Sequence, residues 1–86
     1  MIINTPKSLA AFVKDSRKQK GLSQSEVASR VGLRQATISE FENNPDRTSI
    51  ETIFKILASM KLELHLVSEN SSMKTSSISV SNGDEW

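Results

Sequence analysis

The sequence predicts an all-α fold, a compact domain of four to five helices, followed by one C-terminal β-strand that pairs across a homodimer. Three observations predict this fold. Apolar residues recur with the spacing of one helical face in four successive segments up to about residue 60. Turn-forming residues separate these segments, namely Gly21, Gly32 and the Asn-Asn-Pro-Asp run at 43–46. Residues 62–66 then alternate apolar and polar side chains, as a strand does.

The first two helices have clear boundaries. We expect the first from about Ser8 to Lys20, because apolar residues at 9, 12 and 13 share one face and Gly21 follows as a stop signal. Ser23 and Glu26 form a capping box, in which the serine hydroxyl and the glutamate carboxylate satisfy each other's backbone N–H groups. The second helix therefore starts after Ser23, and Gly32 ends it.

The next two helices follow the same logic. The third should begin near Arg34 or Gln35, with Ile38 and Phe41 turned toward the core. A second capping box, Thr48 with Glu51, should open the fourth helix, which runs to about residue 60. Its inward stripe is expected to contain Ile50, Ile53, Phe54 and Leu57, with Ile56 and Met60 to the side. This apolar surface is wider than one small core requires, so either the helix is deeply buried or part of it meets another subunit.

The strand at 62–66 is the basis for expecting a dimer. A lone strand leaves its backbone N–H and C=O groups without partners and exposes Leu62, Leu64 and Leu66. Pairing with the same strand of a second copy solves both problems. The alternative is a short extended arm that lies on its own domain.

The chain divides at about residue 67. Residues 1–67 carry ten Lys/Arg and seven Asp/Glu, a net charge of +3, and should form the folded domain. Residues 68–86 form a serine-rich acidic tail with a net charge of −2, for which we expect disorder because bulky apolar residues are sparse. Within it, residues 78–80 show only a faint strand alternation. Trp86, with Asp84 and Glu85, is either an irrelevant terminus or a short motif that binds a partner protein.

The composition argues against catalytic or metal chemistry. The chain has no cysteine and one histidine, His65, so disulfides are excluded and a zinc site would lack its usual ligands. It has no glycine-rich phosphate loop and no close carboxylate pair in a credible pocket, and His65 falls on the polar face of the strand. We therefore expect no enzyme, no catalytic residue, no metal and no cofactor.

The sequence also favours a cytoplasmic location. No apolar run approaches the roughly 18 residues that a membrane span needs. The N-terminus lacks the basic start and apolar stretch of a signal peptide.

The segment Ser23–Asn44 has the layout of a helix-turn-helix, two short helices around a glycine turn, with small and polar residues on the outer face of the second. Such a helix fits the major groove of B-DNA, where arginine can fork onto guanine, a glutamine amide can pair with adenine, and an alanine methyl can touch a thymine methyl. The expected base contacts are Arg34, Gln35, Ala36 and Ser39. The expected phosphate contacts are Ser23, Gln24, Asn44 and Arg47. A basic cluster at residues 14–20 is consistent with a polyanionic partner, although a solvated helix face would look the same.

The stretch from Gly21 to Asn43 resembles the Cro/repressor (XRE) family of helix-turn-helix proteins. The resemblance covers residues 8 to about 60 and implies that Gln24 grips phosphate while residues 34–36 and 39 read bases. It also implies a buried ion pair between Arg17 and Glu42 that ties the first helix to the recognition helix.

The run from Arg34 to Asp46, followed by one helix and one leucine-alternating strand, is more specifically similar to the HipB-type antitoxins. This similarity implies a homodimer that pairs its strands, binds palindromic operator DNA, represses its own operon and neutralises a HipA-type Ser/Thr kinase toxin. Two alternatives remain open: a stand-alone regulator of the same family without a toxin partner, and a pure protein-interaction module that has lost DNA binding.

Overall fold

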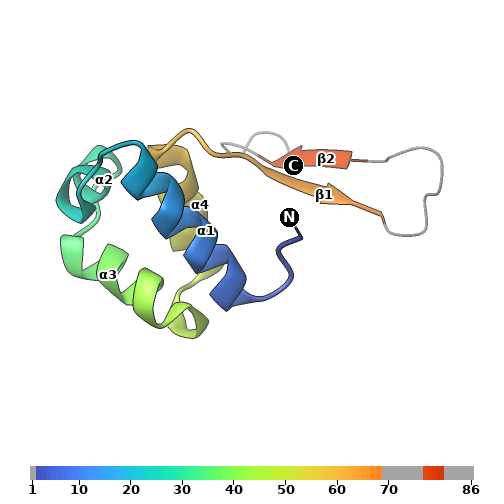
Figure 1. Cartoon of the computed structure of the whole chain (residues 1–86), viewed down its shortest axis with the longest axis horizontal. Helices are drawn as coiled ribbons and strands as arrows, with labels where there is room; N and C mark the ends of the chain where they lie inside the picture. Colours follow the sequence, from blue (N-terminus) through green and yellow to red (C-terminus); the bar gives the residue numbers. More distant parts are fainter. Residues whose placement is uncertain (1, 69–76, 81–86) are drawn as a thin grey trace.

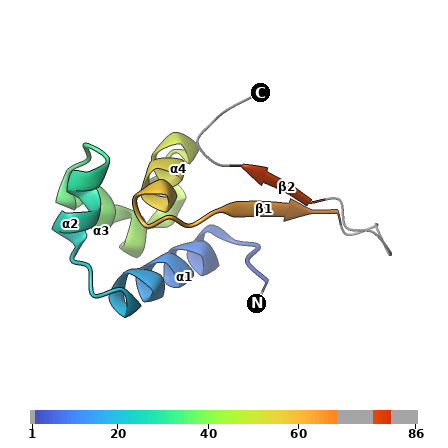
Figure 2. The ribbon, with the colours of Figure 1, turned by 90° about the horizontal axis from the view of Figure 1, so that it is seen from above.

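A computed structural model of the chain describes residues 2–68 and 77–80. The helices form one body from which a two-stranded hairpin extends (Figures 1 and 2). The elements in chain order are α1 (Pro6–Gln19), α2 (Gln24–Arg30), α3 (Gln35–Asn43), a 3-10 turn η1 (Pro45–Arg47), α4 (Ile50–Ser59), β1 (Leu64–Val67) and β2 (Ser77–Val80). The predicted helical domain is therefore confirmed, with the 3-10 turn as the short fifth helical element.

Side-chain caps fix the starts of α1 and α2. Thr5 caps α1, and its hydroxyl accepts from the backbone N–H of Ser8 at 3.0 Å, so this helix starts two residues before the expected Ser8. The predicted capping box of α2 is present: Ser23 Oγ accepts from Glu26 N at 3.0 Å, and Glu26 Oε1 accepts from Ser23 N at 2.7 Å. In each helix, one backbone N–H of the first turn and the N–H of the N-cap residue therefore have side-chain partners.

The start of α4 differs from the prediction by one residue. Ser49, not Thr48, is the N-cap, and its hydroxyl accepts from Thr52 N at 3.2 Å. The reason lies in the preceding turn, because Thr48 N donates to Pro45 O at 3.0 Å and so belongs to the end of η1. Thr48 Oγ1 is buried and has no hydrogen-bond partner among the described residues, so it caps neither helix.

Left-handed residues follow three of the helices. Gly21 and Gly32 have φ of 68° and 69°, a region that costs glycine little. Lys61 has φ of 58° at the equivalent place after α4, where the N–H of Leu62 donates to Leu57 O at 2.9 Å. A lysine thus occupies a helix-ending position that favours glycine.

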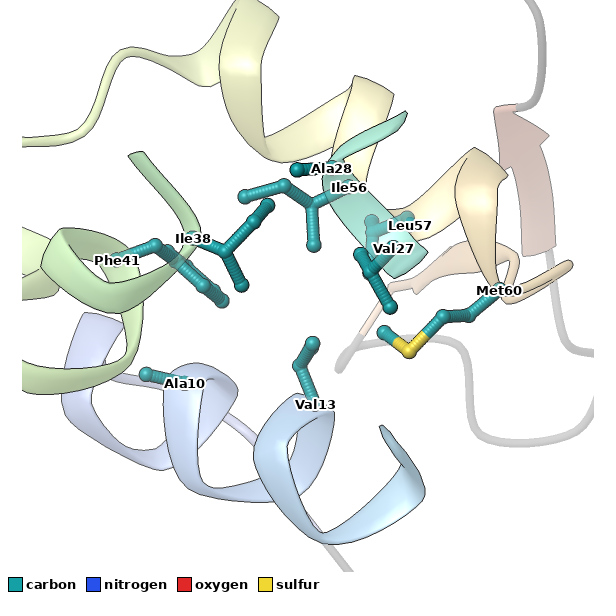
Figure 3. Close-up of a cluster of buried hydrophobic side chains, with 9 residues drawn as sticks. All are labelled: Ala10, Val13, Val27, Ala28, Ile38, Phe41, Ile56, Leu57 and Met60. Atoms are coloured by element: carbon teal, nitrogen blue, oxygen red, sulfur yellow. The ribbon is translucent and has the colours of Figure 1, made fainter. Parts of the chain in front are cut away.

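The core lies between the four α-helices (Figure 3). Its members, 6% exposed or less, are Ala10, Val13, Val27, Ala28, Ile38, Phe41, Ile56, Leu57 and Met60. Ile38 and Phe41 face inward as predicted. The predicted stripe of α4 is partly wrong, because Ile50 and Phe54 are 64% and 37% exposed while Ile56 and Met60 are buried. The helix is rotated so that its second apolar stripe meets the core.

The C-terminal strand also differs in detail. It begins at Leu64, so Leu62 precedes it and packs partly buried against the core. Its partner within the chain is β2, antiparallel, with Leu64 opposite Val80 and Val67 opposite Ser77. The strand that was expected to have no partner in its own chain therefore has one. The prediction of disorder is wrong for residues 77–80, which form β2.

The remaining tail predictions lie outside the described residues, among them the motif at Trp86. The division of the chain at residue 67 stays a prediction. Within residues 2–68 and 77–80, no helix is long and apolar enough to cross a membrane. The same described residues contain no cluster of three acidic or histidine side chains that could hold a metal ion.

Candidate nucleic-acid interface

The turn between α2 and α3 sets the geometry of the site. Val27 and Ala28 of α2 pack in the same core as Ile38 of α3, and Leu33 N donates to Ala28 O at 2.9 Å across the turn. With Ile38 and Phe41 buried, the opposite side of α3 is left at the surface. Figure 1 shows α3 at the edge of the helical body, away from the hairpin. The exposed residues of this side are Gln35, Ala36, Glu40 and Asn43, with Ser39 half-buried among them.

A buried ion pair joins α1 to the C-terminal end of α3. Arg17 Nε donates to Glu42 Oε2 at 2.7 Å, and Arg17 Nη2 donates to Glu42 Oε1 at 3.1 Å. The side chains of Arg17 and Glu42 are 11% and 1% exposed, respectively. Arg17 Nη1 also donates to Leu22 O at 2.9 Å, so the guanidinium holds the loop before α2 as well. The two residues that the family resemblance paired are thus in bidentate contact.

Gln24 extends this cluster to the reading face. Its Nε2 donates to Glu42 Oε1 at 3.0 Å, and its Oε1 accepts from Gln35 Nε2 at 2.7 Å. A continuous chain of hydrogen bonds therefore runs from buried Arg17 to exposed Gln35. Sequence reasoning assigned Gln24 and Gln35 to phosphate and base but missed their contact, because they are 11 residues apart on different helices.

The charge on Glu42 follows from these neighbours. Burial alone would raise the pKa of the Glu42 carboxyl, but hydrogen bonds from Arg17 and Gln24 and the positive charges of Arg17 and Lys14 outweigh burial and hold the pKa below its ordinary value. Glu42 is therefore a carboxylate at neutral pH, able only to accept hydrogen bonds.

The other predicted DNA contacts surround this cluster. Ser23 caps α2 and is exposed. Arg34 is the exposed N-cap of α3 and makes no side-chain cap bond. Asn44 ends α3, and Arg47 lies in η1, both exposed at the far end of the helix. All of the predicted contacts thus lie along α3, at its two ends or at the start of α2.

Asn43 is a polar residue of the same surface that the sequence-based contact list omitted. Its Nδ2 donates to Ser39 Oγ at 3.3 Å, one helical turn away. The i,i+4 spacing of these residues was a signal that could have found the pair. The row Gln35, Ser39 and Asn43 gives α3 alternating amide and hydroxyl groups suited to base edges and phosphates.

The predicted dimer residues lie on the other side of the molecule. Leu62 and Leu64 are partly buried against the core, and Leu66 is 53% exposed. The hairpin that carries Leu64 and Leu66 points away from α3 (Figure 2). The candidate DNA-contacting and dimer-forming surfaces are therefore separate.

Comparison with known proteins agrees with this geometry. Residues 13–67 match the family described as Helix-turn-helix. Antitoxin HipB of Escherichia coli O6:H1 (strain CFT073) is 53% identical over 64 residues, which are 74% of this chain and 68% of that protein. A chain of the solved HipA-HipB-O2-O3 complex superposes with a TM-score of 0.78 at 47% identity, covering 81% of this chain and 99% of that one. A chain of the HipB-O4 20mer complex gives the same values.

The family match includes every part of the site. The family match begins in α1 before Arg17 and ends with β1, so it contains the ion pair, both helices of the motif and α4. The predicted resemblance is confirmed. This chain belongs to the helix-turn-helix family and, within it, to the HipB antitoxins.

Proposed function

We propose that this chain is a homodimeric, sequence-specific DNA-binding repressor that acts as the antitoxin of a toxin–antitoxin pair. One observation carries the DNA-binding part: α3 presents a small, polar face that is free of the core and anchored from behind by the Arg17–Glu42 pair. The HipB proteins it resembles have been solved in complexes with O4 20mer and with HipA and O2-O3. The protein acts by binding, not by catalysis, in the cytoplasm where its operator lies.

Each surface residue has a proposed role in this complex. Arg34, Gln35, Ala36 and Ser39 contact bases from α3 in the major groove. Ser23, Gln24, Asn44 and Arg47 contact phosphates on the two sides of that groove. The first group sets which sequence is bound, and the second sets the register of the protein on any sequence.

The dimer is proposed from the opposite surface. Ile50 and Phe54 lie one turn apart on α4 and are 64% and 37% exposed, while Leu66 and Val67 of β1 are 53% and 59% exposed. Side chains of this size at the surface, together with a strand, are typical of a subunit interface. A two-fold dimer would place two copies of α3 on successive turns of a palindromic operator.

DNA binding can be tested by fluorescence anisotropy with a duplex from upstream of the chain's own coding sequence. We expect log affinity to fall linearly with log salt, at about −0.9 per phosphate neutralised. Arg47→Ala, which removes a proposed phosphate contact, should weaken binding to all sequences alike, whereas Gln35→Ala should relax preference at one base pair per half-site. Glu51→Asp, at an exposed position of α4 outside every proposed contact, keeps the net charge and is the matched control. Affinity that does not depend on salt or sequence would refute the repressor function and favour a pure protein-interaction module.

The antitoxin part needs a separate test. The purified chain should bind and inhibit a HipA-like kinase encoded beside it, and deletion of residues 84–86 should weaken that binding while operator affinity is unchanged. Wild-type kinase affinity in the deletion would remove the proposed role of Trp86. If no adjacent gene encodes a kinase, the stand-alone regulator becomes the better account.

A further inference from the structure

We propose that Glu42 is a positioning residue for base recognition, because it fixes which way round the carboxamide of Gln35 presents its donor and acceptor to DNA. This inference rests on the proposed base contact of Gln35. Glu42 itself is 1% exposed and reaches no base. Its influence passes through Gln24, which touches both residues.

The first step is the orientation of Gln24. The Glu42 carboxylate can only accept hydrogen bonds, and it already accepts two from Arg17. A glutamine beside it must therefore turn its NH₂ group toward it, and Gln24 Nε2 lies 3.0 Å from Glu42 Oε1. The reversed amide would place two acceptor oxygens in contact, so this orientation of Gln24 is fixed by charge.

The second step transmits that orientation to α3. With its NH₂ group facing Glu42, Gln24 offers only its oxygen to Gln35. Gln35 responds by donating Nε2 to Gln24 Oε1 at 2.7 Å. One N–H of Gln35 is used in this contact, which leaves a second N–H and the amide oxygen for DNA.

The third step is the match to a base. A free donor beside a free acceptor complements adenine, which presents the N7 acceptor and the N6 donor in the major groove. If Gln24 were reversed, it would donate to the oxygen of Gln35, and both N–H groups of Gln35 would then face the groove. Two donors complement guanine, which presents the N7 and O6 acceptors. The carboxylate at position 42 therefore selects adenine over guanine at the base pair under Gln35.

Glu42→Gln tests this chain of contacts, because a glutamine can donate as well as accept and so permits both orientations of Gln24. The measurement is the affinity for the palindromic operator divided by the affinity for an operator in which one A·T pair is changed to G·C in both half-sites. This ratio is determined for each A·T position in turn. For wild-type protein, changing the A·T pair under Gln35 to G·C should lower the affinity about tenfold. Glu42→Gln should reduce that ratio severalfold or invert it, and leave the ratios at other positions unchanged.

Three variants separate specificity from stability. Ile56→Val lowers stability from the core without touching the chain of contacts and should keep the wild-type ratio. Gln24→Met leaves the Arg17–Glu42 pair in place but cuts its link to Gln35. It should therefore lose the preference for A·T at the pair under Gln35, even if Glu42→Gln fails to fold. Gln35→Ala should abolish the ratio at the same pair.

The outcomes distinguish this inference from the proposed function. Suppose that Gln35→Ala loses the preference for A·T but that Glu42→Gln or Gln24→Met keeps the wild-type ratio. This result would overturn the role of Glu42 and leave Gln35 as a base contact. A wild-type ratio in Gln35→Ala at every position would overturn both. Loss of the ratio in Ile56→Val would show that general destabilisation, not amide orientation, causes the effect.

Discussion

Removing one partner of the Arg17–Glu42 pair should cost far more stability than replacing both. In Glu42→Ala, the Arg17 guanidinium loses two charge-assisted hydrogen bonds, at 2.7 and 3.1 Å, and remains at a site where the side chain is 11% exposed. A buried charge without its partner costs about 3–5 kcal/mol. The described N-terminal body spans residues 2–68, so its total stability at about 0.05–0.15 kcal/mol per residue is about 3–10 kcal/mol. Glu42→Ala should therefore lie close to the limit of folding.

The double variant Arg17→Met/Glu42→Leu should be markedly more stable than Glu42→Ala. Both desolvated charges are then absent, and two apolar side chains occupy the same space. Leu22 O and the amide of Gln24 still lose their partners, a cost of about 1–3 kcal/mol for each unsatisfied group. Urea unfolding at neutral pH measures the free energies of unfolding of the wild type, of Arg17→Met, of Glu42→Leu and of the double variant. A double variant that is destabilised by the sum of the two single variants would refute the assignment of the cost to an unpaired buried charge.

Glu42, Lys61 and Ser23 each make a contribution to stability that a single substitution can measure. The pKa of Glu42 is lower in the folded than in the unfolded protein, so its contribution to stability is fully present above the unfolded pKa and is lost as pH falls through the folded pKa. The free energy of unfolding should therefore drop below about pH 4.5, and the drop should be shallower in Glu42→Gln. Lys61→Gly should raise the free energy of unfolding by about 0.5–1 kcal/mol because φ is 58°, whereas Lys61→Ala should bring no gain. Ser23→Ala should cost about 1 kcal/mol through loss of the α2 cap, and an unchanged thermal midpoint would contradict the capping role.

Local signals explain why most of the fold could be predicted. The apolar spacing of α1–α3, the capping box of α2 and the glycines after α1 and α2 depend on residues within one turn of each other. The cap of α4 was misplaced because Thr48 and Ser49 are both good N-caps and only the three-dimensional end of η1 decides between them. The exposed stripe of α4 was misassigned for a similar reason, since both stripes have helical spacing and packing chooses one.

In the site, too, features set by neighbouring residues could be predicted, whereas contacts between different helices could not. The polar face of α3 is visible in the sequence because Ile38 and Phe41 define its opposite side. The contacts of Gln24 with Glu42 and Gln35 join residues 18 and 11 apart on different helices, and no spacing rule predicts them. The pairing of β1 with β2 within one chain joins residues at least ten positions apart, and the alternation of residues 62–66 does not specify which strand becomes the partner.

The central claim is that the outer face of α3 meets DNA, and amide chemical-shift mapping tests it directly. Titrating isotope-labelled protein with the operator duplex should shift the amide signals of residues 34–36, 39, 43 and 44 and of the start of α2. The signals of α4 around Ile50 and Phe54 should stay in place at constant protein concentration. Shifts concentrated on α4 or the hairpin, with α3 unaffected, would contradict the account.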